Sequence, residues 1–174
     1  IVLDQGQVAF DGGVEEAVGY YVLSPSKSNS IFPRKINTSL YIQNATIIQG
    51  EQTNATNILN DTPLTINVKL NRPLTQGENL EIGFYNDFGD KVAHIGTSLK
   101  PHPINPCNKI SFYLTKFPFF SGAYAINIAI KRDLDCIDWI SNAITFHVEN
   151  GDFYHSGKYP DSNKTPFLLD FLIK

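Results

Sequence analysis

The feature that most constrains the fold is a set of short apolar runs with a period of two residues. The segment 64-LTINVKL-70 is the clearest example, because every second residue is Leu, Ile or Val and the residues between them are polar. Successive side chains of a strand point to opposite faces, so this pattern predicts a strand that is buried on one face only. The same reasoning predicts strands at these ranges: 36–48, 64–70, 80–84, 92–97, 109–114, 123–130, 143–148 and 167–173.

Turn residues separate these runs, and residues 86–90 (NDFGD) predict a hairpin between two of them. About seven short, half-buried strands joined by turns are typical of two packed antiparallel sheets. The sequence therefore predicts an all-β fold, an immunoglobulin-like antiparallel β-sandwich. The last run, from Phe167 to Ile173, follows a polar segment at residues 151–165. We expect it to pair either with its own sheet or with the sheet of a neighbouring copy.

The first 23 residues have a different character. Residues 7–10 (QVAF) predict a short strand, and residues 11–13 (DGG) predict a turn. Val14, Val18 and Tyr21 then recur at helical spacing. This β-turn-α unit is too small to bury its own apolar stripe, so it is expected to dock on another part of the protein.

The chain starts at Ile1 and contains no methionine, which leads us to expect a piece of a longer protein; a processed mature protein is the alternative. Residues 24–34 (SPSKSNSIFPR) are rich in serine and proline and predict a linker. The expected organisation is a remnant of another domain at 1–23, a linker at 24–34 and the β-sandwich at 35–174.

Charge and composition argue against several classes of protein. The net charge of -3 and the pI near 5.8 argue against a nucleic-acid partner, which requires clustered Lys and Arg. No apolar run approaches the roughly 18 residues of a membrane span. Cys107 and Cys136 leave the redox compartment open, and no histidine stands at zinc-ligand spacing from either of them.

The pattern Asn-X-Ser/Thr is more frequent than composition alone would give. This excess is the main argument for a secreted glycoprotein, but an asparagine-rich sequence with asparagines in turns is the preferred explanation. The five positions are Asn37, Asn44, Asn54, Asn60 and Asn163.

No group of residues forms a recognisable catalytic or metal site. Asp133, Asp135 and Asp138 could hold calcium, but the glycine and the closing glutamate of a calcium loop are missing. The sequence has no G-x-S-x-G nucleophile motif and no glycine-rich phosphate loop. It therefore predicts neither an enzyme nor a cofactor, and the acidic segment 133–138 is expected to be a solvated hairpin.

The outward positions of three predicted strands suggest a binding surface instead. Gly83, Ala125 and Ala129 make its centre shallow, and polar or aromatic side chains surround them. Such a shelf suits a flat polar ligand such as a sugar. The candidate carbohydrate-binding residues are Tyr85, Asn127 and His147, with His94 and Lys131 at the margin, and Trp139 and Asp138 as the next candidates. The sole tryptophan, Trp139, fits either a core residue or a stacking platform.

Two sets of motifs carry a resemblance to a known family. The opening 3-LDQGQVAFDGGVEEAVGYY-21 resembles the end of an ABC-transporter ATPase domain, with Gly6, Asp11, Gly12 and Tyr21 in the expected places. The rest resembles the C-terminal domain of the ATPase subunit of polysaccharide exporters, the Wzt type. The matching stretches are 64-LTINVKL-70, 82-IGFYNDFGDKV-92, 121-SGAYAINIAI-130 and, most specifically, 146-FHVENGDFYHSG-157.

This resemblance implies a non-catalytic, cytosolic module that binds an O-antigen polysaccharide, often at its non-reducing end, for export by an ABC transporter. It also implies a pairing of two copies, for which exchange of the strand from Phe167 to Ile173 offers a route. Because the chain has no Walker motifs, ATP hydrolysis is not expected. The alternatives are a secreted, glycosylated Ig-like adhesion or receptor domain and a sugar-cleaving enzyme.

Overall fold

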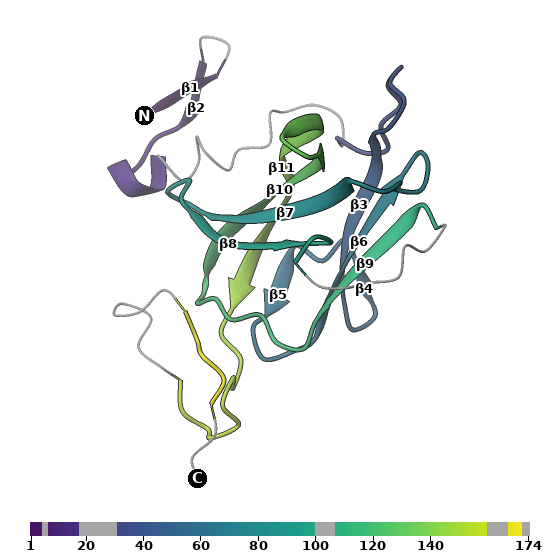
Figure 1. The fold of residues 1–174 in the computed structure, drawn as a ribbon. Coiled ribbons are helices and arrows are strands. Elements are labelled where there is room, and N and C mark those ends of the chain that lie inside the picture. Colours follow the sequence, from purple (N-terminus) through teal and green to yellow (C-terminus); the bar gives the residue numbers. More distant parts are fainter. Residues whose placement is uncertain (5–6, 18–30, 100–106, 160–166, 172–174) are drawn as a thin grey trace.

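The computed structural model describes residues 1–4, 7–17, 31–99, 107–159 and 167–171. Two sheets pack face to face in Figure 1. The order in the five-stranded sheet is β5-β11-β10-β7-β8, and in the four-stranded sheet it is β4-β3-β6-β9. The strands of the first are β5 (Asn57–Leu59), β11 (Asp135–Glu149), β10 (Gly122–Arg132), β7 (Glu78–Asn86) and β8 (Lys91–Gly96). Those of the second are β4 (Gln52–Thr53), β3 (Ile42–Gln49), β6 (Leu64–Leu70) and β9 (Lys109–Leu114).

The predicted all-β sandwich is confirmed, and β6 and β9 have the predicted bounds. The first predicted strand, 36–48, begins later than expected, at Ile42. Just before it, the backbone N–H of Tyr41 binds the Asn71 side chain at 2.7 Å. The short strand β5 was not predicted. It runs parallel to β11, so the five-stranded sheet is mixed at that edge.

Alternating residues of both sheets fill the space between them. The fully buried side chains include Ile66, Ile82 and Phe84, and Tyr124 stacks on Phe119 with ring centroids 5.3 Å apart. Burial raises the pKa of Tyr124 to about 12. The apolar faces predicted for β6, β7 and β10 are the faces that form this core, and their opposite faces are left for solvent or a ligand.

The N-terminal segment forms a hairpin of β1 (Val2–Asp4) and β2 (Gln7–Phe10), followed by one helical turn at residues 14–17. The Glu16 carboxylate accepts a hydrogen bond from the Gly13 N–H at 3.1 Å, which caps this turn. Val8 and Val14 are 61% and 81% exposed. Val18 and Tyr21 of the predicted helix lie outside the described residues, as does most of the predicted linker.

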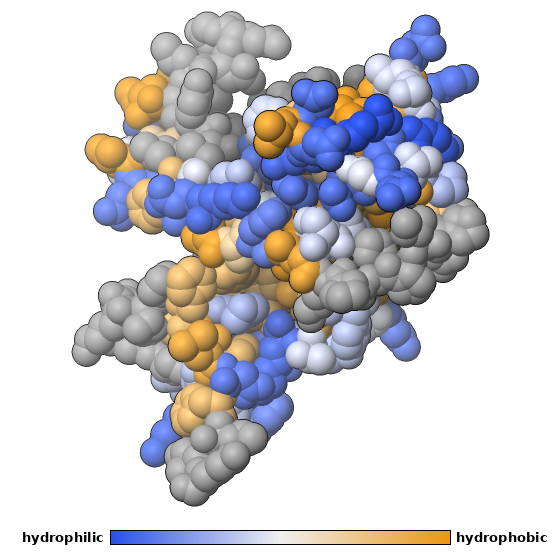
Figure 2. All heavy atoms as spheres, in the orientation of Figure 1, coloured by the Kyte–Doolittle hydropathy of each residue, from blue (hydrophilic) through white to orange (hydrophobic). Residues whose placement is uncertain are grey.

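The segment 167–171 does not form the predicted final strand. Phe167 makes an isolated bridge with Phe119, and Leu168 packs in a small second core with Phe120 and Phe153. The Leu168 N–H donates to the Pro118 carbonyl at 2.8 Å, but Pro118 has no N–H with which to extend a ladder. Leu169 and Phe171 are exposed, and Figure 2 shows apolar residues at the surface around this C-terminal segment.

The stretch that carries the most specific motif, residues 150–157, has a structural role. The Gly151 N–H donates to Asn60 Oδ1 at 2.8 Å, and Asn60 Nδ2 donates to the Phe119 carbonyl at 3.2 Å. Asn60 is 1% exposed, so in this fold it cannot accept a glycan. Within the described ranges, no helix is long and apolar enough to cross a membrane.

Candidate functional site

The outer face of the five-stranded sheet contains a hollow of about 230 Å³ over β7, β10 and β11. The three strands predicted to be neighbours are adjacent, and Asn127 on β10 pairs with Gly83 on β7. Ala129 pairs with Glu81 on one side and with Trp139 on the other. The lining residues are Glu81, Gly83, Tyr85, Lys91, His94, Asn127, Ala129, Lys131, Cys136 and Trp139.

Small residues make the hollow, as predicted. A Cβ atom at Gly83 would lie 2.9 Å from a ring carbon of Tyr85 and 3.2 Å from Cε of Lys91. The Tyr85 ring and the Lys91 stem therefore lean over the glycine, and any side chain at this position would displace them. Gly83 is what allows these two groups to lie close to the sheet.

Trp139 is 59% exposed and lines the hollow, so the interpretation as a core residue is wrong. The reason is the alternation of β11: Asp138 and Ile140 are buried, which turns the residue between them to the outer face. The aromatic rings of Trp139 and Tyr85 come from strands on opposite sides of β10. They flank the small-residue floor from two sides.

Asn127 is held in place by a backbone group. Its Oδ1 accepts a hydrogen bond of 2.7 Å from the N–H of Asn142, a residue with a φ of 48° beside a register shift in β11. Because the oxygen is engaged, the amide nitrogen is the group that Asn127 can offer to a ligand. Asn127 thus makes a structural bond and also lines the hollow.

Glu81 was not among the predicted site residues, and it organises the charges of the hollow. Its carboxylate lies 2.7 Å from Lys131 Nζ and 3.5 Å from His94 Nε2. Burial pushes the pKa of Glu81 up, but the hydrogen bond and the charge of Lys131 outweigh it and leave the pKa below its ordinary value. The same hydrogen bond raises the pKa of Lys131. The period of two through Gly83 and Tyr85 places Glu81 on this face and could have identified it.

The structure does not bring His147 to the hollow. It pairs with Ala123 on β10 and with Asn57 on β5, whereas Asn127 is four residues further along β10. At ~3.3 Å per residue this separation is about 13 Å. The predicted residues Tyr85, Asn127, His94, Lys131 and Trp139 do lie together.

Asp138 is committed to the fold. Its carboxylate accepts hydrogen bonds from Arg34 at 2.9 and 3.1 Å and from the Ile42 N–H at 2.9 Å. It is therefore not available to a ligand in the hollow. No group of three or more potential metal ligands occurs among the described residues, so Asp133 and Asp135 do not form a site with it.

Comparison with known proteins places the chain in a family. A model of the Wzt C-terminal domain matches residues 34–159. The chain belongs to the Wzt C-terminal domain family. A crystal structure of the C-terminal domain of Wzt has a TM-score of 0.55 and 11% identity, covering 78% of this chain and 83% of that one. At this identity the likeness shows the shared fold.

A second solved structure, the PmoD soluble domain from Methylocystis sp., has a TM-score of 0.40 and 12% identity, covering 65% of this chain and 94% of that one. No curated protein matches the chain. The family assignment therefore rests on the family model, and the Wzt domain structure shows the shared fold; both agree with the resemblance in the sequence motifs.

Proposed function

We propose that this Wzt C-terminal domain is a non-catalytic module that binds a carbohydrate in the hollow over β7, β10 and β11. Membership of the family supports a carbohydrate-binding role. The observation that carries the proposal is the arrangement of Trp139 and Tyr85 around a floor of Gly83 and Ala129. Exposed aromatic faces bind the apolar faces of sugar rings, and nearby amide and charged groups bind hydroxyls.

The size of the hollow favours a single sugar residue. Its volume of about 230 Å³ lies below the roughly 300–1,000 Å³ of sites for drug-sized ligands. Lys131 and Asn127 are suited to donate to sugar oxygens, and Glu81 is suited to accept from hydroxyls. Since Glu81 is ionised and already paired with Lys131, the pair is preorganised and needs little rearrangement on binding.

Membership of the family also supports a proposal for the wider role. We infer that the ligand is a bacterial O-antigen polysaccharide, bound at its non-reducing end, and that the full-length protein is the cytoplasmic ATPase subunit of an ABC exporter. The exposed Val8 and Val14 of the N-terminal hairpin and helical turn fit a unit that packs against the rest of an ATPase domain. The membrane subunit of the transporter is then a partner of the full-length protein.

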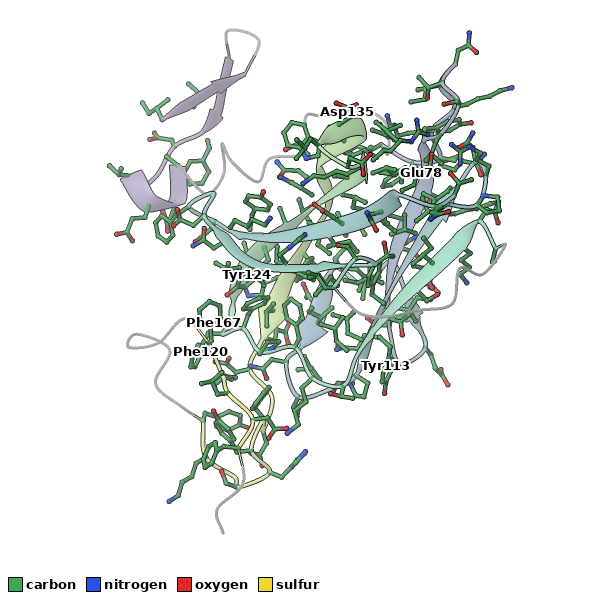
Figure 3. All side chains as sticks on the ribbon, viewed as in Figure 1. Glu78, Tyr113, Phe120, Tyr124, Asp135 and Phe167 are labelled. Carbon is green, nitrogen blue, oxygen red and sulfur yellow. The ribbon has the colours of Figure 1, made fainter. Side chains whose placement is uncertain are left out.

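The site is tested by replacing Tyr85 and Asn127 with alanine and measuring binding to an array of bacterial O-polysaccharides. We expect binding to be lost in both variants. The melting temperature should change little in Tyr85→Ala, whose side chain faces outward, and should fall in Asn127→Ala, which also loses the hydrogen bond from the Asn142 N–H. Tyr113→Ala is the matched control, since Tyr113 is 65% exposed on β9 of the other sheet and is labelled in Figure 3. Unchanged binding in both site variants would place the ligand elsewhere.

We also infer that the domain is a homodimer that exchanges the segment from Phe167 to Ile173. Leu168 packs against Phe120 and Phe153, and Lys116 lies 3.5 Å from Asp170. An exchanged segment from a second copy would make the same contacts, so exchange costs little. The test is light scattering of the full chain and of a chain truncated after Glu149. A monomeric full chain, or an unchanged dimer after truncation, would contradict the inference.

A further inference from the structure

Trp139 lies on a short piece of β11 whose pairing with β10 is interrupted on both sides. Residues 138–140 pair in register with residues 128–130, and register shifts flank this stretch at both ends. A bulge disrupts the ladder locally and re-aims the side chains beside it. The position of the Trp139 ring therefore depends on contacts other than a long continuous ladder.

The carboxylate of Asp138 supplies such contacts from the opposite face of β11. It is 8% exposed and receives both Arg34 guanidinium nitrogens, at 2.9 and 3.1 Å, as a bidentate pair. It also receives the backbone N–H of Ile42 at 2.9 Å. Ile42 is the first residue of β3, which belongs to the other sheet. Asp138 thus fastens the Trp139 segment to the opposite layer of the sandwich.

The second register shift has its own polar anchor. Residues 141–143 lie opposite Asn127, and the Asn142 N–H donates to Asn127 Oδ1 at 2.7 Å. The Trp139 segment is therefore held at one end by a residue of the hollow and at the other end by the Arg34–Asp138 pair. Asn127 lines the hollow, whereas Arg34 and Asp138 do not and can affect it only through β11.

We propose that Arg34 and Asp138 are positioning residues for the ligand site, which hold β11 so that the Trp139 ring stays beside the hollow. Side chains 138 and 139 share one peptide unit and point to opposite faces, so freedom at Asp138 is passed directly to the ring. The effect of Arg34 and Asp138 on ligand affinity rests on the proposed function, but their effect on the position of the Trp139 ring does not. The pair also links the segment that leads into β3 with the site.

The test uses Trp139 itself, because it is the only tryptophan in the chain. The decay of its fluorescence anisotropy in the ligand-free protein measures the mobility of the ring. We expect a larger amplitude of ring motion in both Asp138→Asn and Arg34→Lys, because each removes the bidentate geometry. If Asp138→Asn does not fold, Arg34→Lys decides the question.

Glu78→Gln is the matched control. Glu78 is also a buried carboxylate with a bidentate arginine, Arg72, but it stands on β7 and does not line the hollow. This variant should lose stability without a change in the motion of Trp139. A purely structural role for Asp138 would make all three variants alike, with lower stability and unchanged anisotropy, and that result would overturn the proposal.

Affinity is measured with O-polysaccharide purified from the strain that encodes the chain. Asp138→Asn and Arg34→Lys should each weaken binding about tenfold, equivalent to roughly 1.4 kcal/mol. Trp139→Ala should weaken it further. Wild-type affinity in Trp139→Ala would refute the proposed site and leave the anisotropy result to decide the positioning role. If Trp139→Ala loses binding but Asp138→Asn and Arg34→Lys have a mobile ring and wild-type affinity, positioning of the ring does not matter for binding.

Discussion

Loss of the Glu78 carboxylate should destabilise the domain strongly. The side chain is 0% exposed and accepts two hydrogen bonds of 2.8 Å from Arg72, one of 2.8 Å from the Thr75 N–H and another from Arg132. Figure 3 labels Glu78 on the sandwich. Glu78→Gln keeps the shape and leaves both guanidinium groups without their counter-charge. Removing one partner of a buried ion pair costs about 3–5 kcal/mol.

The arginine side chains are 31% and 52% exposed and can be rehydrated, so we expect the lower end of this range. A loss of about 3 kcal/mol corresponds to a fall in melting temperature of roughly 6–12 °C for a chain of this size. Urea unfolding at neutral pH measures it. Glu51→Gln, at an exposed position, is the control and should change the free energy of unfolding by less than about 0.5 kcal/mol.

The effect should depend on pH in a defined direction. The hydrogen bond from Arg72 holds the pKa of Glu78 well below its ordinary value, although burial opposes this. The pKa in the folded state is thus lower than in the unfolded chain, where it is about 4.3. The stabilisation is complete above that value and is lost as the pH falls toward the folded pKa. The difference between wild type and Glu78→Gln should therefore shrink below about pH 4. A loss under about 1 kcal/mol at neutral pH, or a difference independent of pH, would refute the reasoning.

Three further predictions concern other parts of the domain. Asn60→Ala removes the amide that joins the end of β5 to the closing motif, and urea unfolding should show a loss of about 3 kcal/mol. Leu168→Ala should cost about 2 kcal/mol, the low end for a buried leucine, because its core is small; no loss would mean that the C-terminal segment is not docked in solution. Gly83→Ala should alter glycan affinity by displacing Tyr85, while melting temperature stays within a few degrees of wild type; unchanged affinity would place the ligand away from this floor.

Much of the fold could be predicted because alternation is a local property. The bounds of β6 and β9, the buried faces of β7 and β10, and the outward placement of Tyr85, Asn127 and Lys131 all follow from the order of apolar residues. The resemblance in the motifs led to the correct family. Glu81 lay within reach of the same reasoning, since it shares the outer face with Gly83 and Tyr85.

What only the tertiary structure decided depends on partners far apart in the chain. The register shifts in β11 determine which residue Trp139 lies beside, because they set its pairing with Ala129 of β10. Asp138 looked like a surface carboxylate in an acidic hairpin, but it is buried by an arginine 104 residues away. His147 lies away from the hollow because it pairs further along the sheet, with Asn57 of β5. The segment 167–171 does not form a strand beside residue 118, because Pro118 has no N–H to continue the hydrogen-bond ladder. A period of two determines the face of each side chain, whereas register and ion pairs determine which of those side chains meet.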